Sequence, residues 1–245
     1  ELIWKQEYMA SFEAFAGMIY PDFKEEIHCK ASPERKVTDI FFVSLDPGWE
    51  HPTACILAKE DLEGNLFVID EFRESHLHVG DISRYLQSML VRNGLKEEDI
   101  EMFIIDPSGR KTDQTSGQSI LFQLQEEGWG FVPANNDLMP GISRVTRMIR
   151  ENRLFIDKNR CPLLVEEIKN YHWKEFNDGS YGMNPTPYKI GDDLVDTVRY
   201  LCMARPDYFE HPKVNMYGEL EKEENDDEVD INESIDNLMS GDSFI

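Results

Sequence analysis

Two apolar runs in this chain each lead into an Asp-Pro pair with a Gly close behind, and this repeated pattern restricts the fold more than any other feature. The first run, residues 40–43, leads through Ser44 and Leu45 into Asp46, and the second, residues 102–105, leads into Asp106. Short apolar runs ended by Pro and Gly are typical of buried strands that leave a sheet in a turn. One Asp in such a place can simply open the turn. Two of them on adjacent strands would bring like charges together, which predicts a cation between Asp46 and Asp106.

The order of the expected elements predicts an α/β fold. Three strands joined by short turns occupy residues 40–71, which is the pattern of an antiparallel meander. A helix near residues 81–93 precedes the second Asp-Pro strand, and a further helix separates that strand from a short strand at residues 130–133. Strand–helix–strand order implies parallel pairing through right-handed crossovers. We therefore expect a five-stranded mixed sheet, with three antiparallel strands followed by two parallel strands, flanked by helices.

A third group of acids begins the last expected helix, residues 192–204. Asp193 and Asp196 are three residues apart and Asp192 and Asp196 are four apart, so each pair shares a helix face. Asp192 and Asp193 are explained as an N-cap and a first-turn acid, which the helix dipole favours. Asp196 in the second turn has no such explanation, and its charge favours a contact with solvent or with a metal ion.

The composition indicates a soluble globular chain with an acidic end. The formal net charge is −23, and the segment 219–242 alone carries eleven Asp and Glu against one Lys. This excess weakens the case for a nucleic-acid partner without removing it, because phosphate contacts rely on Lys and Arg. The four cysteines are scattered without a CxxC pair, which fits a reducing cytosol. No run approaches the roughly 20 apolar residues of a membrane span, and no signal peptide is recognisable.

Together these segments resemble the RNase H-like (retroviral integrase) superfamily and, within it, the C-terminal nuclease domain of the large terminase subunit of tailed bacteriophages. The resemblance rests on residues 6–8, 45–48, 105–109 and 192–200, and covers most of residues 1–205. Members of that family differ at the third site. Some use the second Asp of the Asp-Asp pair, and others place His there and use the Asp three residues later. This sequence has acids at both places, so Asp193 and Asp196 both stay candidates.

The resemblance implies an endonuclease that cuts double-stranded DNA during viral genome packaging. In that chemistry two divalent cations, roughly 3.5–4 Å apart, activate a water and stabilise the leaving oxygen of a phosphodiester. Carboxylates suit Mg²⁺ or Mn²⁺ because these hard ions prefer oxygen ligands. We expect Asp46 to bridge both ions, Asp106 to hold one, and Asp193 or Asp196 to hold the other.

The same resemblance implies a domain organisation and a set of partners. No GxxxxGK[ST] loop occurs, so we expect no ATP site in this chain. Residues 1–35 are expected to connect to an N-terminal ATPase domain, residues 36–217 to form the nuclease domain, and residues 218–245 to be a disordered acidic tail. The implied partners are double-stranded DNA, the portal and the small terminase subunit, and the implied location is the host cytoplasm, at the procapsid.

Basic side chains that could contact DNA occur in two places. Arg144, Arg147 and Arg150 form a row at helical spacing within a segment of net charge +4, residues 144–160. Arg110 and Lys111 lie close behind Asp106 and are also placed to meet a phosphate. A solvated helix face explains the arginine row equally well.

Three other functions fit parts of the pattern. Another RNase H-like nuclease, such as a Holliday-junction resolvase or a transposase core, would share the chemistry and differ in substrate. A non-catalytic RNase H-like scaffolding domain would use the same acids as caps and turns. An actin-like sugar or acetate kinase is disfavoured because the chain lacks a second Gly-rich phosphate loop.

Overall fold

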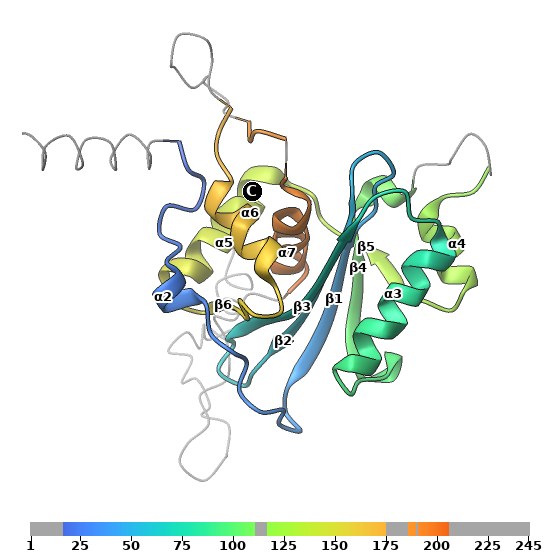
Figure 1. The fold of residues 1–245 in the computed structure, drawn as a ribbon, viewed down its shortest axis with the longest axis horizontal. Coiled ribbons are helices and arrows are strands. Elements are labelled where there is room, and N and C mark those ends of the chain that lie inside the picture. Colours follow the sequence, from blue (N-terminus) through green and yellow to red (C-terminus); the bar gives the residue numbers. More distant parts are fainter. Residues whose placement is uncertain (1–16, 111–116, 175–185, 190, 206–245) are drawn as a thin grey trace, which may run out of the picture. The chain divides into compact units, whose positions relative to one another are not determined.

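A computed structural model describes residues 17–110, 117–174, 186–189 and 191–205, all within one structural unit. The centre of this part of the chain is a six-stranded mixed sheet in the order β5-β4-β1-β2-β3-β6 (Figure 1). The strands are β1 (Ile40–Asp46), β2 (Thr53–Glu60), β3 (Leu66–Glu74), β4 (Ile100–Ile105), β5 (Phe131–Pro133) and β6 (Leu154–Ile156).

The strand pairing confirms the predicted mixed sheet and adds one strand to it. β1, β2 and β3 form the antiparallel meander, and β4 and β5 continue the sheet in parallel beside β1. The prediction of five strands was wrong by one, because residues 154–156 pair in parallel with β3 at the other edge. Three apolar residues are too few to show a strand period, so the sequence did not distinguish β6 from a loop.

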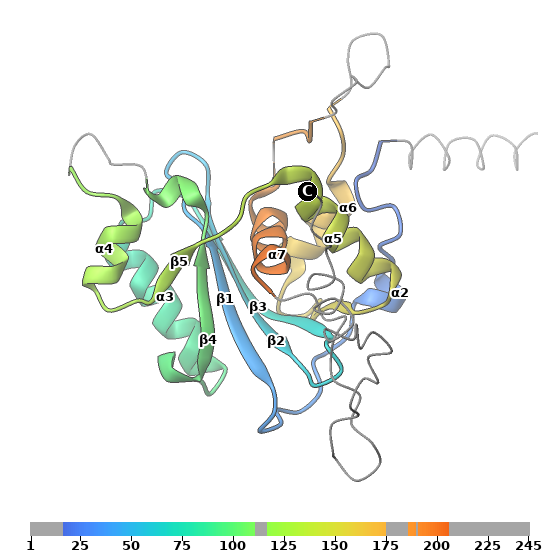
Figure 2. The ribbon, with the colours of Figure 1, turned by 180° about the vertical axis from the view of Figure 1, so that it is seen from behind.

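Helices cover both faces of the sheet. α5, α6 and α7 pack on one face, while α3 and α4 pack on the other (Figures 1 and 2). The helices are α2 (Glu25–His28), α3 (Val79–Arg92), α4 (Ile120–Glu126), α5 (Leu138–Arg150), α6 (Pro162–Asn170) and α7 (Asp193–Ala204), with short 3₁₀ turns η1 (Glu97–Asp99) and η2 (Pro107–Arg110). None of the described helices combines the length and the apolar character needed to cross a membrane.

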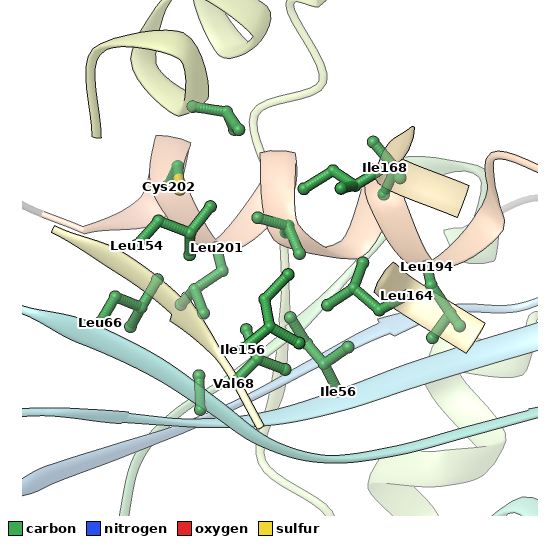
Figure 3. Packing of buried hydrophobic residues seen from close by; sticks show 14 of the residues in the cluster. Ile56, Leu66, Val68, Leu154, Ile156, Leu164, Ile168, Leu194, Leu201 and Cys202 are labelled. Carbon is green, nitrogen blue, oxygen red and sulfur yellow. The ribbon is translucent and has the colours of Figure 1, made fainter. Parts of the chain in front are cut away.

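Each face of the sheet has its own apolar core, and strand alternation decides which residue joins which core. Along β1, Phe41, Val43 and Leu45 face the α3 and α4 layer, whereas Phe42 faces the α5, α6 and α7 layer. Figure 3 shows the second of these cores, where side chains of the central strands and β6 meet those of α6 and α7. The alternation places Ser44 and Asp46 on the α7 face as well.

α7 is fixed on the sheet by buried contacts along its length. Its residues from Leu194 to Cys202 are buried, and the Ser44 hydroxyl donates a hydrogen bond of 2.8 Å to the Thr197 carbonyl oxygen. α5 packs closely beside it at Gly141, where a Cβ atom would lie 2.5 Å from Cγ of Arg199. A side chain at this glycine would therefore displace the buried Arg199 side chain. The start of α7 is thereby held above the ends of β1 and β4.

Part of the predicted connector packs on this domain. Ile19, Tyr20 and Phe23 belong to the core beneath α5, α6 and α7, and Cys29 forms an isolated bridge with Ile156 of β6. Residues 1–16 of the predicted connector and the whole predicted tail, residues 218–245, lie outside the described residues. The division at residues 35 and 217 therefore stays a prediction.

Candidate metal centre

Two of the predicted site residues lie side by side where β1 and β4 end. These strands pair in parallel with Leu45 opposite Ile105, and the Asp106 backbone N–H donates to the Leu45 carbonyl oxygen at 3.0 Å. Asp46 and Asp106 are the next residues on their strands, so both carboxylates emerge at the same edge. The alternation of Ser44 and Ile104 into the α7 face places both aspartates on that face too.

The first turns of α7 bring the other two candidates to this edge. Asp196 is 5% exposed, and its Oδ1 accepts a hydrogen bond from Nε of Arg199 at 3.1 Å. Its Oδ2 lies 3.1 Å from Nζ of Lys189, which also pairs with Asp192 at 2.9 Å. Asp193 pairs instead with Arg73 of β3, whose Nε lies 3.2 Å from its Oδ2. Asp193 and Asp196, the two candidates for the third metal ligand, therefore both lie at the start of α7 but have different cationic partners.

The pKa of Asp46 shows that these carboxylates share one electrostatic environment. Burial is the largest cause that raises this pKa to about 8, and the charges of Asp106, Asp196 and Asp193 follow in that order. Burial also raises the pKa of Asp193. A carboxyl group that stays protonated near neutral pH for these reasons is one whose charged form a divalent cation would stabilise.

The carboxylates open into a pocket of about 430 Å³ between the β1–β2 loop and the start of α7. The pocket is lined by Asp46, Pro47, Gly48, Trp49, Glu50, His51, Pro52, Lys189, Asp192, Asp193 and Asp196. Asp106 is not among the lining residues, and hydrogen bonds hold its carboxylate. Its Oδ1 accepts from the Ser108 backbone N–H at 2.6 Å, its Oδ2 accepts from Nδ2 of Asn136 at 2.9 Å, and Tyr200 also hydrogen-bonds to it.

The donor chemistry of this group fits a hard divalent cation, while the side chains are not yet arranged around one. Every candidate ligand is a carboxylate, which suits Mg²⁺ or Mn²⁺ better than a thiophilic metal. Within the described residues, no three His, Cys, Asp or Glu side chains converge at ligating distance. The α7 carboxylates are paired instead with Arg73, Lys189 and Arg199. Lys189 lies between Asp192 and Asp196 and pairs with both carboxylates.

Comparison with known proteins identifies other chains with this architecture. No protein-family model matches. The chain is 21% identical over 209 residues to the large terminase subunit of Escherichia phage T5, which covers 80% of this chain and 44% of that protein. The nuclease domain of the P22 large terminase superposes with a TM-score of 0.61 at 20% identity, covering 76% of this chain and 91% of that domain. The chain has the fold of phage large-terminase nuclease domains.

Two further structures, both from thermophilic phages, support this relationship of fold. One is a large terminase that gives a TM-score of 0.64 at 21% identity, over 76% of this chain and 44% of that protein. The other is the large-terminase nuclease of phage G20c, which gives 0.52 at 13% identity, over 76% of this chain and 96% of that domain. The chain thus spans less than half the length of the full-length relatives it matches and nearly all of the isolated nuclease domains.

A buried glutamate that the sequence analysis missed supports the start of α7. Glu167 of α6 is 4% exposed, and its Oε2 accepts from the backbone N–H groups of Leu194 at 2.8 Å and Val195 at 3.1 Å. Burial raises its pKa to about 7. Its Oε1 also pairs with Arg73 at 3.3 Å, so one glutamate joins the end of β3 to the first turn of α7. The available signal was its place on the apolar stripe of α6, beside Ile168.

Arg199 was also missed, although its sequence position next to the acids is suggestive. Its side chain is 2% exposed, and its Nη1 donates to the Asn136 carbonyl oxygen at 3.3 Å while the guanidinium pairs with Asp196. Because Asn136 also holds Asp106, Arg199 links two of the candidate ligands through one loop. Burial of an arginine is rare without a carboxylate partner, but the sequence alone does not say which arginine of the helix is buried.

The predicted DNA contacts lie in different surroundings from one another. Arg110 is exposed at the end of η2, and Lys111 lies outside the described residues. Arg144 donates to three carbonyl oxygens at the end of α7, those of Cys202, Met203 and Arg205, at 3.1–3.4 Å. This contact gives Arg144 a structural role at the last turn of α7.

The remaining two arginines lie toward the far end of α5. α5 begins beside Asn136, which contacts Asp106, and runs for 13 residues before it ends at Arg150. At about 1.5 Å per residue, Arg150 is roughly 18 Å farther along the helix than its start. Arg150 pairs with Asp22 at 2.7 Å. Arg147 and Arg150 both line one pocket on the surface of α5. A role for Arg147 and Arg150 in DNA binding therefore stays a prediction and would involve DNA well away from the aspartates.

Proposed function

We propose that this chain is a metal-dependent endonuclease domain that cuts double-stranded DNA during viral genome packaging. One observation carries the proposal. Asp46, Asp106 and the acids of α7 meet at one edge of an RNase H-like sheet, in an environment that raises the pKa of Asp46 to about 8. Carboxylates that serve only as caps or turn residues do not need to gather at one edge of the sheet.

The residues that would hold the ions follow from their positions. Asp46 is under the electrostatic influence of both Asp106 and the α7 acids. It would be the ligand shared by two Mg²⁺ or Mn²⁺ ions, with Asp106 holding one of them and Asp193 or Asp196 the other. The ions, when bound, would activate a water and stabilise the leaving oxygen of the phosphodiester. Asp196 has the larger influence of the two on the pKa of Asp46, which favours it as the third ligand.

The chain's own residues would orient this site. The Ser108 backbone N–H and Asn136 fix both oxygens of Asp106, so its carboxylate cannot rotate freely. Glu167 and Ser44 hold the start of α7 at its height above the sheet. Lys189 pairs with both Asp192 and Asp196, offsets part of their negative charge, and is exposed enough, at 60%, to move aside when the ions bind.

Solved relatives support the choice of cation. The large-terminase nuclease domain of phage SPP1 has been solved with bound Mn, and that of phage G20c with bound magnesium and with bound cobalt. These are the hard or borderline divalent ions that an all-carboxylate site selects. The count of two ions in this chain is part of the proposal.

The biological setting is proposed from the same relatives. The match to less than half of the phage T5 large terminase subunit supports a nuclease portion of a longer packaging protein. In that setting the partners would be an N-terminal ATPase domain, the portal and the small terminase subunit, and the place of action the procapsid in the host cytoplasm. Arg110, Lys111, Arg147 and Arg150 are the proposed DNA contacts.

The proposal is tested by incubating the chain with supercoiled plasmid in Mg²⁺, in Mn²⁺ and in EDTA. The expected result is nicking and linearisation in either metal, none in EDTA, and none with Asp46→Asn. Glu63→Gln is the matched control, because Glu63 is exposed in the β2–β3 turn at the opposite end of the sheet. Absence of cleavage in every metal, together with no rise in melting temperature on adding Mn²⁺, would favour a non-catalytic scaffolding domain.

A further inference from the structure

Trp49 stands half-exposed at the mouth of the acidic pocket. It belongs to the β1–β2 loop, lines the pocket together with Asp46 and Asp193, and is 48% exposed. By contrast, Trp129 packs in the core beneath α3 and α4 and is 4% exposed. Single exposed apolar side chains are common on proteins and need no explanation by themselves. Trp49, however, lies only three residues after Asp46, the proposed bridging ligand, and lines the same pocket.

Two histidine rings hold the indole from the neighbouring loop. The ring of His76 meets Trp49 edge-on at 5.5 Å between centroids, and the ring of His78 lies tilted at 5.1 Å. The His76 backbone N–H also donates to the Trp49 carbonyl oxygen at 3.1 Å. The backbone of His76 has φ +59°, a left-handed conformation that residues other than glycine seldom adopt. His78 is the N-cap residue of α3, and its backbone N–H donates to Oδ2 of Asp81 at 3.0 Å.

The loop that carries Trp49 is itself tightly constrained. A Cβ atom at Gly48 would lie 2.3 Å from the His51 carbonyl oxygen, so only glycine allows this turn. The Thr53 hydroxyl bridges the backbone of Gly48, accepting from its N–H at 3.2 Å and donating to its carbonyl oxygen at 2.9 Å. The indole is therefore a pre-positioned aromatic surface, held in place before any ligand arrives.

The charge of the pocket limits what this surface can bind. Five carboxylates and one lysine line the pocket, so phosphate groups gain little there from basic side chains. Stacking of a nucleobase on an aromatic ring does not depend on charge, and every base offers a face for it. A base inside an intact duplex is already stacked on both faces, whereas an unpaired base is free to stack on protein.

We propose that Trp49 is a positioning residue that stacks on an unpaired nucleobase next to the scissile phosphate, an inference that rests on the nuclease function proposed above. It assigns the pocket a preference for DNA whose bases are unpaired at the point of cleavage, such as single strands, gaps or frayed duplex. The histidine-braced indole supplies the nucleotide contact that the acidic lining does not.

Binding is measured first, by fluorescence anisotropy of end-labelled DNA with Ca²⁺ in place of Mg²⁺, for an oligothymidine and for a duplex of equal length. Trp49→Leu, which keeps an apolar side chain and removes the ring, is expected to weaken oligothymidine binding about tenfold to a hundredfold. Duplex binding should change less than about threefold. Trp49→Phe, which keeps a ring, should retain most of the affinity, and Leu62→Ala, a 60% exposed apolar residue of the β2–β3 turn, should change neither.

Equal weakening of both substrates by Trp49→Leu, or no weakening of either, would overturn the stacking role. Melting temperatures of all variants show whether a loss of binding reflects a loss of folding. If the Leu variant is destabilised, the ratio of its oligothymidine affinity to its duplex affinity carries the test, because a loss of folded protein lowers both affinities alike. Plasmid and gapped-duplex cleavage in Mn²⁺ separates the two proposals. If the unmodified chain cuts neither substrate, the nuclease function fails. If it cuts both and Trp49→Leu slows both equally, only the stacking role fails.

Discussion

Two aspartates of the same sheet, Asp70 on β3 and Asp46 on β1, are surrounded in opposite ways. Asp70 is 3% exposed and accepts from Arg92 at 2.6 and 2.8 Å, from Arg160 at 3.1 Å and from Asn93 at 2.6 Å. Among the described residues no Lys or Arg forms an ion pair with Asp46, and the strongest charges acting on it come from other carboxylates. A buried acid with a complete set of cationic partners stabilises the fold, whereas one surrounded by like charges is a candidate ligand for a cation, as proposed for Asp46.

The largest expected difference between the two concerns activity. Asp46→Asn should reduce Mn²⁺-dependent plasmid cleavage by about a thousandfold or more, because it removes a ligand from both proposed ions. Asp70→Asn should retain cleavage within about threefold at a temperature where it stays folded. Gel assays under single-turnover conditions measure both. If the Asp70 variant loses as much activity as the Asp46 variant while still folded, the contrast between the two sites is wrong.

Asp193 and Asp196 are intermediate cases, because each has cationic partners and yet faces the pocket. The stronger influence of Asp196 on Asp46 predicts that Asp196→Asn lowers cleavage about a hundredfold, and Asp193→Asn about tenfold. The Mn²⁺-induced rise in melting temperature should disappear in the first variant and persist in the second. The opposite order would make Asp193 the third ligand and assign Asp196 to its pairs with Lys189 and Arg199.

The two substitutions should affect stability in the opposite order: Asp70→Asn should destabilise the protein, and Asp46→Asn should not. Asp70→Asn leaves Arg92 without its partner and should lower the free energy of unfolding by about 2–3 kcal/mol, since Arg92 is partly exposed. Asp46→Asn should raise the melting temperature of the metal-free protein at pH 8, because it removes a charge that the site disfavours. Thermal unfolding in EDTA measures both changes. A destabilised Asp46 variant would mean that its carboxylate has a structural partner after all.

The pH dependence of stability follows from the raised pKa of Asp46. The folded state keeps its proton up to about pH 8, while the unfolded state loses it near pH 4, so the folded state binds more protons between these values. Metal-free stability should therefore fall as the pH rises from about 4 to about 8. Glu167, with a pKa of about 7, acts in the same direction, so Asp46→Asn should flatten the slope without abolishing it.

A divalent cation should reverse this trend, since it binds the deprotonated site. With Mg²⁺ present, the melting temperature at pH 8 should exceed the value in EDTA by about 2–4 °C per kcal/mol of binding energy, and the difference should vanish at pH 5. Paired melting curves at the two pH values measure the effect. A metal-induced shift of equal size at both would place the cation away from Asp46.

The sequence sufficed for the parts of this molecule that depend on local pattern. The strands that end at Asp46 and Asp106, their parallel pairing and the acidic start of α7 all follow from periodicity and turn residues. The sequence did not suffice to predict hydrogen bonds and ion pairs between segments that are far apart in the chain. Glu167 contacts the start of α7 across 27 and 28 residues of sequence, and Arg144 contacts the end of α7 across about 60. Local sequence patterns do not reveal contacts between residues so far apart in the chain.

The smallest expected effect separates two arginines that the sequence treats alike. Arg110 is exposed close behind Asp106, so Arg110→Ala should weaken duplex binding and reduce the slope of log affinity against log salt by about one phosphate contact, with no change in melting temperature. Arg144→Ala should leave that slope unchanged and lower the free energy of unfolding by about 1–2 kcal/mol, because three carbonyl oxygens at the end of α7 lose a donor. Salt titrations of DNA binding, read beside melting curves of the same two variants, measure both quantities. A lower salt slope for Arg144→Ala would return that residue to the DNA surface, and an unchanged slope for Arg110→Ala would mean that the duplex approaches the aspartates from the side of α7.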